Sequence, residues 1–103
     1  METIIESTNF KTSEVLNTQI EEKASSILKL EPRALYAEFN LTAIKNLFSC
    51  TLILNVPGRD IVTTSTSDDM YKSVANSIAA AKRRLRKKKM KRIAMKKNKN
   101  KTG

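Results

Sequence analysis

The residues of this sequence whose types and spacing could do chemistry are cationic. The stretch from Lys82 to Arg92, KRRLRKKKMKR, places nine Lys and Arg side chains in eleven residues. An unpaired Lys or Arg is almost never fully buried, so these side chains must face solvent or a polyanion. Cations that neutralise phosphates release condensed counterions, which gives affinity for nucleic acid without reading its sequence. Phosphate binding is therefore the chemistry that this stretch predicts.

The charges of the 103-residue chain are segregated along the sequence. Residues 1–69 contain all ten acidic side chains and six basic ones, whereas residues 70–103 contain fourteen basic side chains and no acidic one. Such asymmetry indicates nucleic acid or an anionic membrane as the partner. A membrane-surface helix needs a wide apolar face. Beyond Leu85 the only apolar residues are Met90, Ile93, Ala94 and Met95, so we expect nucleic acid and no membrane partner. A purely solvated charged face is an alternative that the lack of interleaved acids disfavours.

Residues for catalysis or metal binding are nearly absent. There is no His, Cys50 is the only Cys, and the only glycines are Gly58 and Gly103. This composition excludes an imidazole base, a Cys/His pair, a histidine or multi-cysteine metal site and a Gly-rich phosphate loop. The adjacent Asp68 and Asp69 are explained as carboxylates at the start of a helix. We therefore expect no enzymatic activity, no cofactor, no metal and no small-molecule substrate, and we interpret Cys50 as a buried small hydrophobe.

The sequence also lacks the marks of membrane insertion or secretion. It has no run of about 18 apolar residues, which is the length needed to span a bilayer. The first residues, METIIESTNF, carry two glutamates and no cationic region followed by an apolar one. A secretory signal peptide has that order of regions, so we expect a cytoplasmic protein.

Hydrophobic periodicity indicates the elements that must position the cationic stretch. Residues 3–7, TIIES, predict a first strand. From Ser13 to about Lys29 the apolar residues recur with helical spacing, with Thr12 or Ser13 as the N-cap and Pro32 just after the end. Period-two alternation then predicts strands over residues 35–41, 48–56 and 60–65, with turns at 45–46 and 57–58. The apolar residues expected inside are Leu16, Ile20, Ala24, Ile27, Leu28, Leu35, Ala37, Phe39, Leu41, Phe48, Cys50, Leu52, Leu54 and Val56.

A second long helix is expected after the last strand. Thr66 and Ser67 offer hydroxyl caps, and Thr66 with Asp69 loosely fits the spacing of a capping box. The apolar stripe of this helix is Met70, Val74, Ile78, Ala81 and Leu85. The order strand, helix, three strands, helix predicts an α+β fold with an antiparallel-rich four-stranded sheet and two helices packed on one face.

Like charges determine the expected end of the ordered domain. Within residues 82–92, five pairs of cations lie four residues apart. At ~0.2–0.5 kcal/mol each, these pairs cost about 1–2.5 kcal/mol in a helix. A helix docked on a core tolerates this cost, but an undocked extension frays. We therefore expect order to fade between Lys88 and Arg92, with a folded domain over residues 1–92 and a disordered basic tail over residues 93–103.

The strand-rich centre favours folded RNA over DNA as the polyanion. No recognition helix of the helix-turn-helix type is visible, and the aromatic pattern of an RNA-recognition-motif sheet is missing. The order helix, three strands, helix resembles the double-stranded-RNA-binding domain, which recognises shape and phosphate geometry. That family places a lysine cluster at the start of its second helix, where this chain has Ser67, Asp68 and Asp69. This difference argues against membership of that family.

Two segments resemble the ribosome hibernation-promoting factors, the ribosome-associated inhibitor family. In GRDIVTTSTSDDMYKSV a Pro-Gly turn, Pro57–Gly58, leads through a short strand into Ser-Asp-Asp-Met-Tyr, Ser67–Tyr71, at the start of the last helix. The segment NFKTSEVLNTQIEEKASSILKL resembles the first helix of that family. The family's helix contains a Glu-Glu-Lys motif, which corresponds to residues 21–23 of this chain. The resemblance runs from about Thr3 to Lys91.

The resemblance implies a ribosome hibernation factor of the short form, without the linker and second domain of the long form. Such a factor binds the small ribosomal subunit at the decoding centre, in the mRNA and tRNA channel. It contacts rRNA through a basic helix surface, blocks translation and preserves inactive ribosomes under stress or in stationary phase. Two departures from the family pattern are Asn17, where many members carry a cation, and the segment TAIKNLF, which lacks an expected His.

The residues predicted to bind rRNA come from two sources. The resemblance implies Lys23, Arg83, Lys87 and Lys91, and the other cations are assigned from charge alone. The complete set is Lys23, Lys82, Arg83, Arg84, Arg86, Lys87, Lys88, Lys89, Lys91 and Arg92. An alternative function is a general structured-RNA-binding or ribosomal accessory protein that does not inhibit translation. A hydrolase acting on RNA is disfavoured, because no base or metal site is visible.

Overall fold

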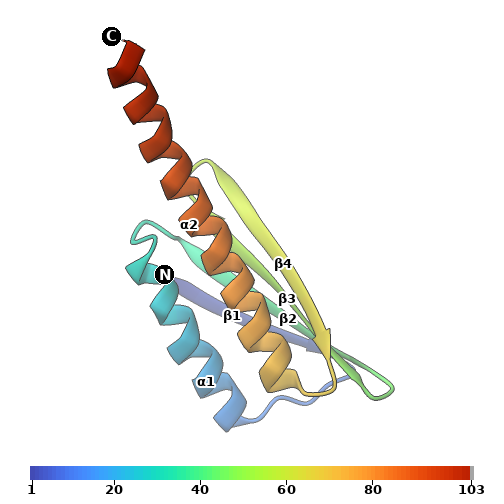
Figure 1. Ribbon diagram of the computed structural model, residues 1–103. Coiled ribbons are helices and arrows are strands. Elements are labelled where there is room, and N and C mark those ends of the chain that lie inside the picture. The colour runs from blue at the N-terminus through green and yellow to red at the C-terminus, as the bar shows by residue number, and fades with distance from the viewer. Residues whose placement is uncertain (103) are drawn as a thin grey trace.

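The computed structural model describes the backbone of residues 1–102 and the side chains of residues 1–87. Its elements follow the order strand, helix, three strands, helix, as predicted (Figure 1). They are β1 (Glu2–Thr8), α1 (Glu14–Ser25), the short 3-10 helix η1 (Ser26–Lys29), β2 (Tyr36–Ile44), β3 (Leu47–Val56), β4 (Arg59–Ser67) and α2 (Met70–Thr102).

The four strands form one mixed sheet in the order β1-β2-β3-β4. Strand β1 runs parallel to β2, which the α1 crossover permits, and the two remaining pairs are antiparallel. Lys45 and Gly58 have positive φ angles of 56° and 88° in the two hairpin turns, both predicted from the sequence. Both helices cover the same face of the sheet, so the predicted α+β fold class is confirmed (Figure 1).

The core lies between the helices and this face of the sheet. Phe39, Leu52 and Leu54 from the sheet are fully buried against Ile20 and Val74 of the two helices. Because a pleated strand points alternate side chains to opposite faces, the predicted alternation in β2 and β3 puts these residues inside. Burying one such side chain contributes about 1.5–3 kcal/mol, so the core positions both helices firmly.

Two serines hold α2 against the centre of the sheet. Ser73 and Ser77 are fully buried and lie one helical turn apart. Their hydroxyls donate to the carbonyl oxygens of Phe48 and Cys50 in β3, at 2.6 and 2.7 Å. On β4, the Thr63 hydroxyl donates to the Ser77 carbonyl at 2.8 Å. Small side chains with satisfied hydroxyls let the helix approach the strands closely. This fixes the direction of the rest of α2, from Lys82 onward, which we call its cationic half.

The start of α1 was predicted correctly, whereas two other details of the sequence interpretation were wrong. The Ser13 hydroxyl oxygen accepts from the Leu16 N–H at 3.1 Å and caps α1 as expected. Leu35 was expected inside but is 69% exposed, because β2 begins one residue later. The Thr66 hydroxyl lies 2.7 Å from the Ser49 hydroxyl on β3, so Thr66 does not cap α2.

The helical backbone of α2 extends beyond its apolar stripe. It continues through the segment Lys88–Arg92 and ends at Thr102. Lys, Arg, Met and Ala are strong helix formers, and this propensity favours a helical backbone in spite of the like-charge pairs. The side chains after Lys87 lie outside the described residues. The expected loss of order between Lys88 and Arg92 and the disordered tail over residues 93–103 stay predictions.

Candidate RNA-binding surface

The cationic half of α2 starts where its buried stripe ends. Within residues 1–87, Leu85 is the last buried residue of that stripe, and the side chains beside it are cations. Four of the described ones are exposed and one, Lys82, is half-buried. Because successive residues of a helix turn by about 100°, cations at consecutive positions point in different directions around the axis. The described cations are Lys82, Arg83, Arg84, Arg86 and Lys87; the predicted Lys88, Lys89, Lys91 and Arg92 follow on the same helix, with side chains outside the described residues.

Lys23 and Lys82 come together although they are far apart in the sequence. Lys23 lies near the end of α1 and Lys82 on α2, and both line one hollow of about 150 Å³ between the helices. Small side chains, Ala75 and Ala79, lie on the α2 side of it, and Ser26 of η1 completes the lining together with Ile78. The structure therefore places a lysine from each helix at one shared hollow, which is an arrangement that suits an anionic group.

The contribution of Ser26 to the lining of this hollow was not predicted from the sequence. Its hydroxyl donates to the Lys23 carbonyl oxygen at 2.5 Å, in the tight turn where α1 passes into η1. No periodicity in the sequence marks that turn. The spacing of Ala75 and Ala79, two small residues one helical turn apart, is a signal that could have indicated a gap beside α2.

Arg84 differs from the other cations of α2 because its side chain has a partner within the protein. One of its guanidinium nitrogens donates to the Val62 carbonyl oxygen at 2.6 Å. Val62 lies on β4, which is an edge strand, so Arg84 covers part of an otherwise open edge. An Arg has five N–H donors, which leaves Arg84 able to contact a phosphate as well. Arg83 and Lys87 lie four residues apart on one exposed side of the helix.

Helix α1 contributes less positive charge than α2 does. It carries Glu14, Glu21 and Glu22 against the single cation Lys23. The basic surface is therefore the cationic half of α2 together with the end of α1. Of the predicted residues, the structure groups Lys23 and Lys82 at one hollow and places Arg83, Arg86 and Lys87 on the adjoining exposed surface.

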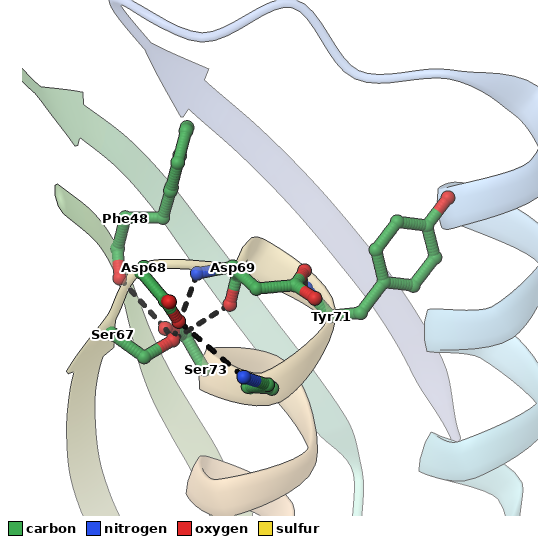
Figure 2. Close-up of polar contacts among 7 residues, drawn as sticks. Phe48, Ser67, Asp68, Asp69, Tyr71 and Ser73 are labelled. Carbon is green, nitrogen blue, oxygen red and sulfur yellow. Dashed lines mark hydrogen bonds and ion pairs between the residues drawn. The ribbon is translucent and has the colours of Figure 1, made fainter. Parts of the chain in front are cut away.

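The segment Ser67–Tyr71 has a structural role in starting α2 (Figure 2). The Ser67 hydroxyl donates to the Asp69 carbonyl oxygen at 2.7 Å and lies 2.7 Å from the Ser73 hydroxyl. The Asp69 carboxylate accepts from the Tyr71 N–H at 2.9 Å, so Asp69 caps the helix. Asp68 forms only an exposed ion pair with Lys72, at 3.5 Å. These contacts orient the N-terminal end of α2, and with it the cationic half.

Residues 1–87 also bear on metal binding, membrane insertion and the state of Cys50. No group of three or more Asp, Glu or Cys side chains there is arranged to hold a metal ion. No helix in the part of the chain searched is long and apolar enough to cross a membrane. Cys50 is fully buried, as predicted, and burial raises the pKa of its thiol to about 11, against a smaller lowering by a hydrogen bond with Ser77.

Comparison with known proteins gives a family match and two solved structures with the same fold. Residues 3–93 match the family described as Sigma 54 modulation protein / S30EA ribosomal protein. A ribosomal subunit interface protein from Coxiella burnetii is 22% identical with a TM-score of 0.82, over 87% of this chain and 99% of that one. The N-terminal domain of Protein Y from Thermus thermophilus is 12% identical with a TM-score of 0.75, over 84% and 98% of the two chains. No curated protein matches the sequence.

Proposed function

Because this chain belongs to the Sigma 54 modulation protein / S30EA ribosomal protein family, we propose that it is a ribosome hibernation factor. The family membership supports a ribosome-binding role. The finer proposal is that the chain binds the small ribosomal subunit at the decoding centre and occupies the mRNA and tRNA channel. There it blocks translation and preserves inactive ribosomes in the cytoplasm under stress or in stationary phase.

The observation that carries this proposal is the hollow shared by Lys23 and Lys82. Two lysines from different helices that line one hollow can offer a phosphate of folded rRNA several N–H donors at once. Arg83, Arg86 and Lys87 extend the positive surface along α2, so that further phosphates can be contacted in one docking geometry. Contacts of this kind give affinity and orientation without base readout, as suits a ligand recognised by its shape.

Rigid attachment of α2 supports docking onto a defined RNA surface. The buried Ser73 and Ser77 tie the helix to β3, and Asp69 caps its start. A preorganised array of cations loses less conformational freedom on binding than a mobile one does. The cationic half of α2 therefore projects in a fixed direction from the domain and can match the spacing of phosphates in a folded RNA.

The test compares two variants with the same change in charge. The variant Lys23→Gln/Lys82→Gln removes both lysines from the hollow, and the variant Lys11→Gln/Lys45→Gln removes two exposed lysines from loops elsewhere. Wild type and the Lys11/Lys45 control should sediment with small subunits and lower the yield of cell-free translation in proportion to their ratio to ribosomes. The Lys23/Lys82 variant should do both more weakly.

Three results would count against the proposal. Absence of the wild-type protein from the small-subunit peak would overturn ribosome binding. Binding without loss of translation at several-fold excess would favour the alternative, a structured-RNA-binding or ribosomal accessory protein that does not inhibit. Equal behaviour of the two lysine variants would show that the hollow does not hold a phosphate.

A further inference from the structure

The face of the sheet opposite the helices is bare, and we call it the open face (Figure 1). Its side chains alternate with those of the core along each strand. They are Glu2, Ile4, Glu6 and Thr8 of β1; Tyr36, Glu38, Asn40, Thr42 and Ile44 of β2; Leu47, Ser49, Thr51, Ile53 and Asn55 of β3; and Asp60, Val62, Thr64 and Thr66 of β4. This set contains four carboxylates and no Lys or Arg. The open face is thus opposite in charge to the cationic half of α2.

The carboxylates gather toward the β1 side of the open face. Ile4 pairs with Glu38 across the two strands, so Glu38 lies diagonal to both Glu2 and Glu6. Within residues 1–87, none of these three glutamates forms an ion pair. The Glu38 carboxylate accepts only from the side-chain amide of Asn40, at 3.2 Å. Like charges on neighbouring strands destabilise a sheet, and a cationic partner would relieve that repulsion.

Apolar side chains lie beside these carboxylates. The register aligns Ile4, Glu38, Ile53 and Val62 in one row across the four strands, and Val62 is 46% exposed. A Lys or Arg side chain has an apolar stem and a charged head, so its stem can pack on Ile53 and Val62 while its head reaches Glu38. The row therefore fits an extended cationic polypeptide.

We propose that the open face binds a lysine- and arginine-rich segment of a ribosomal protein while the helices bind rRNA. This inference rests on the proposed function, because it names a second partner within the same ribosome. Charge complementarity favours a basic occupant over RNA and over the open face of a second copy. The carboxylates repel the phosphates of RNA, and they also repel the open face of a second copy of this chain. A basic protein segment is not repelled by these carboxylates.

The test uses two triple variants that raise the net charge equally. Glu2→Gln/Glu6→Gln/Glu38→Gln removes carboxylates from the open face, and Glu14→Gln/Glu21→Gln/Glu22→Gln removes them from α1. If the sheet acids acted only through overall charge, both variants would bind the polyanionic ribosome more tightly. We expect the open-face variant instead to bind ribosomes about tenfold more weakly, as three lost exposed ion pairs imply, and the α1 variant to bind at least as well as wild type. Equal or tighter binding by the open-face variant would overturn the inference.

A cross-link identifies the partner. A photoreactive residue placed at Thr64, an exposed position on the open face, should attach to a ribosomal protein within a Lys- and Arg-rich segment, as located by mass spectrometry. Cross-links to rRNA alone or to a second copy of this chain, or none from protein that sediments with ribosomes, would overturn this inference and leave the proposed function standing. Failure of the wild-type protein to sediment with ribosomes would overturn both.

Discussion

The two halves of α2 differ in what holds their side chains. From Met70 to Ala81 the helix is fixed by buried apolar residues and by the Ser73 and Ser77 hydroxyls on β3. From Lys82 onward, Leu85 alone among the described side chains is buried, and the others are cations. The first half therefore contributes to folding free energy and the second to binding free energy. Substitutions of first-half residues that do not line the hollow of Lys23 and Lys82 should therefore leave ribosome affinity nearly unchanged, and substitutions of the exposed cations should leave the free energy of unfolding nearly unchanged.

The largest expected effect follows from truncating a buried side chain in the first half of α2, Met70 to Ala81, which we call the docked half. Ile78 is 4% exposed, so Ile78→Ala leaves a cavity under α2 and should lower the free energy of unfolding by about 2–5 kcal/mol. Urea denaturation measures this change. Asn76→Ala, an exposed control on the same helix, should change it by less than about 0.5 kcal/mol. A loss below that size in Ile78→Ala would contradict the packing described for α2.

The next effect concerns the cationic half. Arg83, Lys87 and Lys91 are spaced four apart, so they follow one side of α2. Replacing all three with Gln should leave folding intact and relieve two like-charge pairs. Ribosome affinity should fall, and the slope of log affinity against log salt should flatten by roughly 2–3 units if each cation neutralises one phosphate.

Truncation after Arg92 is the comparison for that triple variant. The basic segment over residues 93–103 can contact any phosphate, so its removal should weaken specific binding to the small subunit less than the triple substitution does. Ribosome affinity measured across a salt series compares the two proteins. If truncation abolished binding while the triple Gln variant bound normally, the protein would be held by its cationic tail and not by a docked helix surface.

A smaller effect concerns Cys50, which lies beneath the docked half. As the only thiol, it should react slowly with a thiol reagent in the native protein and quickly in denaturant. Its pKa is raised from 9.0 to about 11 by burial, so between these values the unfolded chain has lost a proton that the folded chain keeps. The free energy of unfolding should therefore fall as pH rises from about 9 to 11.

Cys50→Ala is the matched control for that titration. Its loss of stability over the same pH interval should be smaller than that of wild type, because the titrating thiol is gone. Fast labelling of the native protein would show that Cys50 lies on the open face, since a shift of one residue in β3 exchanges the two faces of the sheet.

The halves of α2 also differ in how far the sequence predicts them. Burial of Val74 and Leu85 follows from helical periodicity, and burial of Phe39 and Leu52 from strand alternation, because both patterns are local. The resemblance carried by Ser67–Tyr71 is confirmed by the family match over residues 3–93. Charge alone indicated that the end of α2 binds a polyanion, but it did not distinguish Arg84, whose partner is a carbonyl on β4.

What escaped prediction depends on contacts between segments far apart in the sequence. The hollow of Lys23 and Lys82 exists because α1 packs beside α2 and because η1 brings Ser26 to it. Thr66 has the spacing of a cap, yet its hydroxyl meets Ser49 across the sheet. Neither outcome is encoded in a local pattern, since each depends on which partner the fold brings within reach.

The smallest expected effect separates two adjacent acids at the start of the docked half. The Asp69 carboxylate accepts from the Tyr71 N–H at 2.9 Å, so Asp69→Ala leaves a helix donor unsatisfied and should lower the free energy of unfolding by about 1 kcal/mol. Asp68 pairs with Lys72 at 3.5 Å, with side chains 80% and 64% exposed, where water screens the attraction. Asp68→Ala should therefore change stability by less than about 0.5 kcal/mol. Urea denaturation of the two variants in parallel measures the difference. Equal losses of stability would mean that both acids act only through their charge near the helix N-terminus, and that the hydrogen bond from the Tyr71 N–H to Asp69 adds nothing.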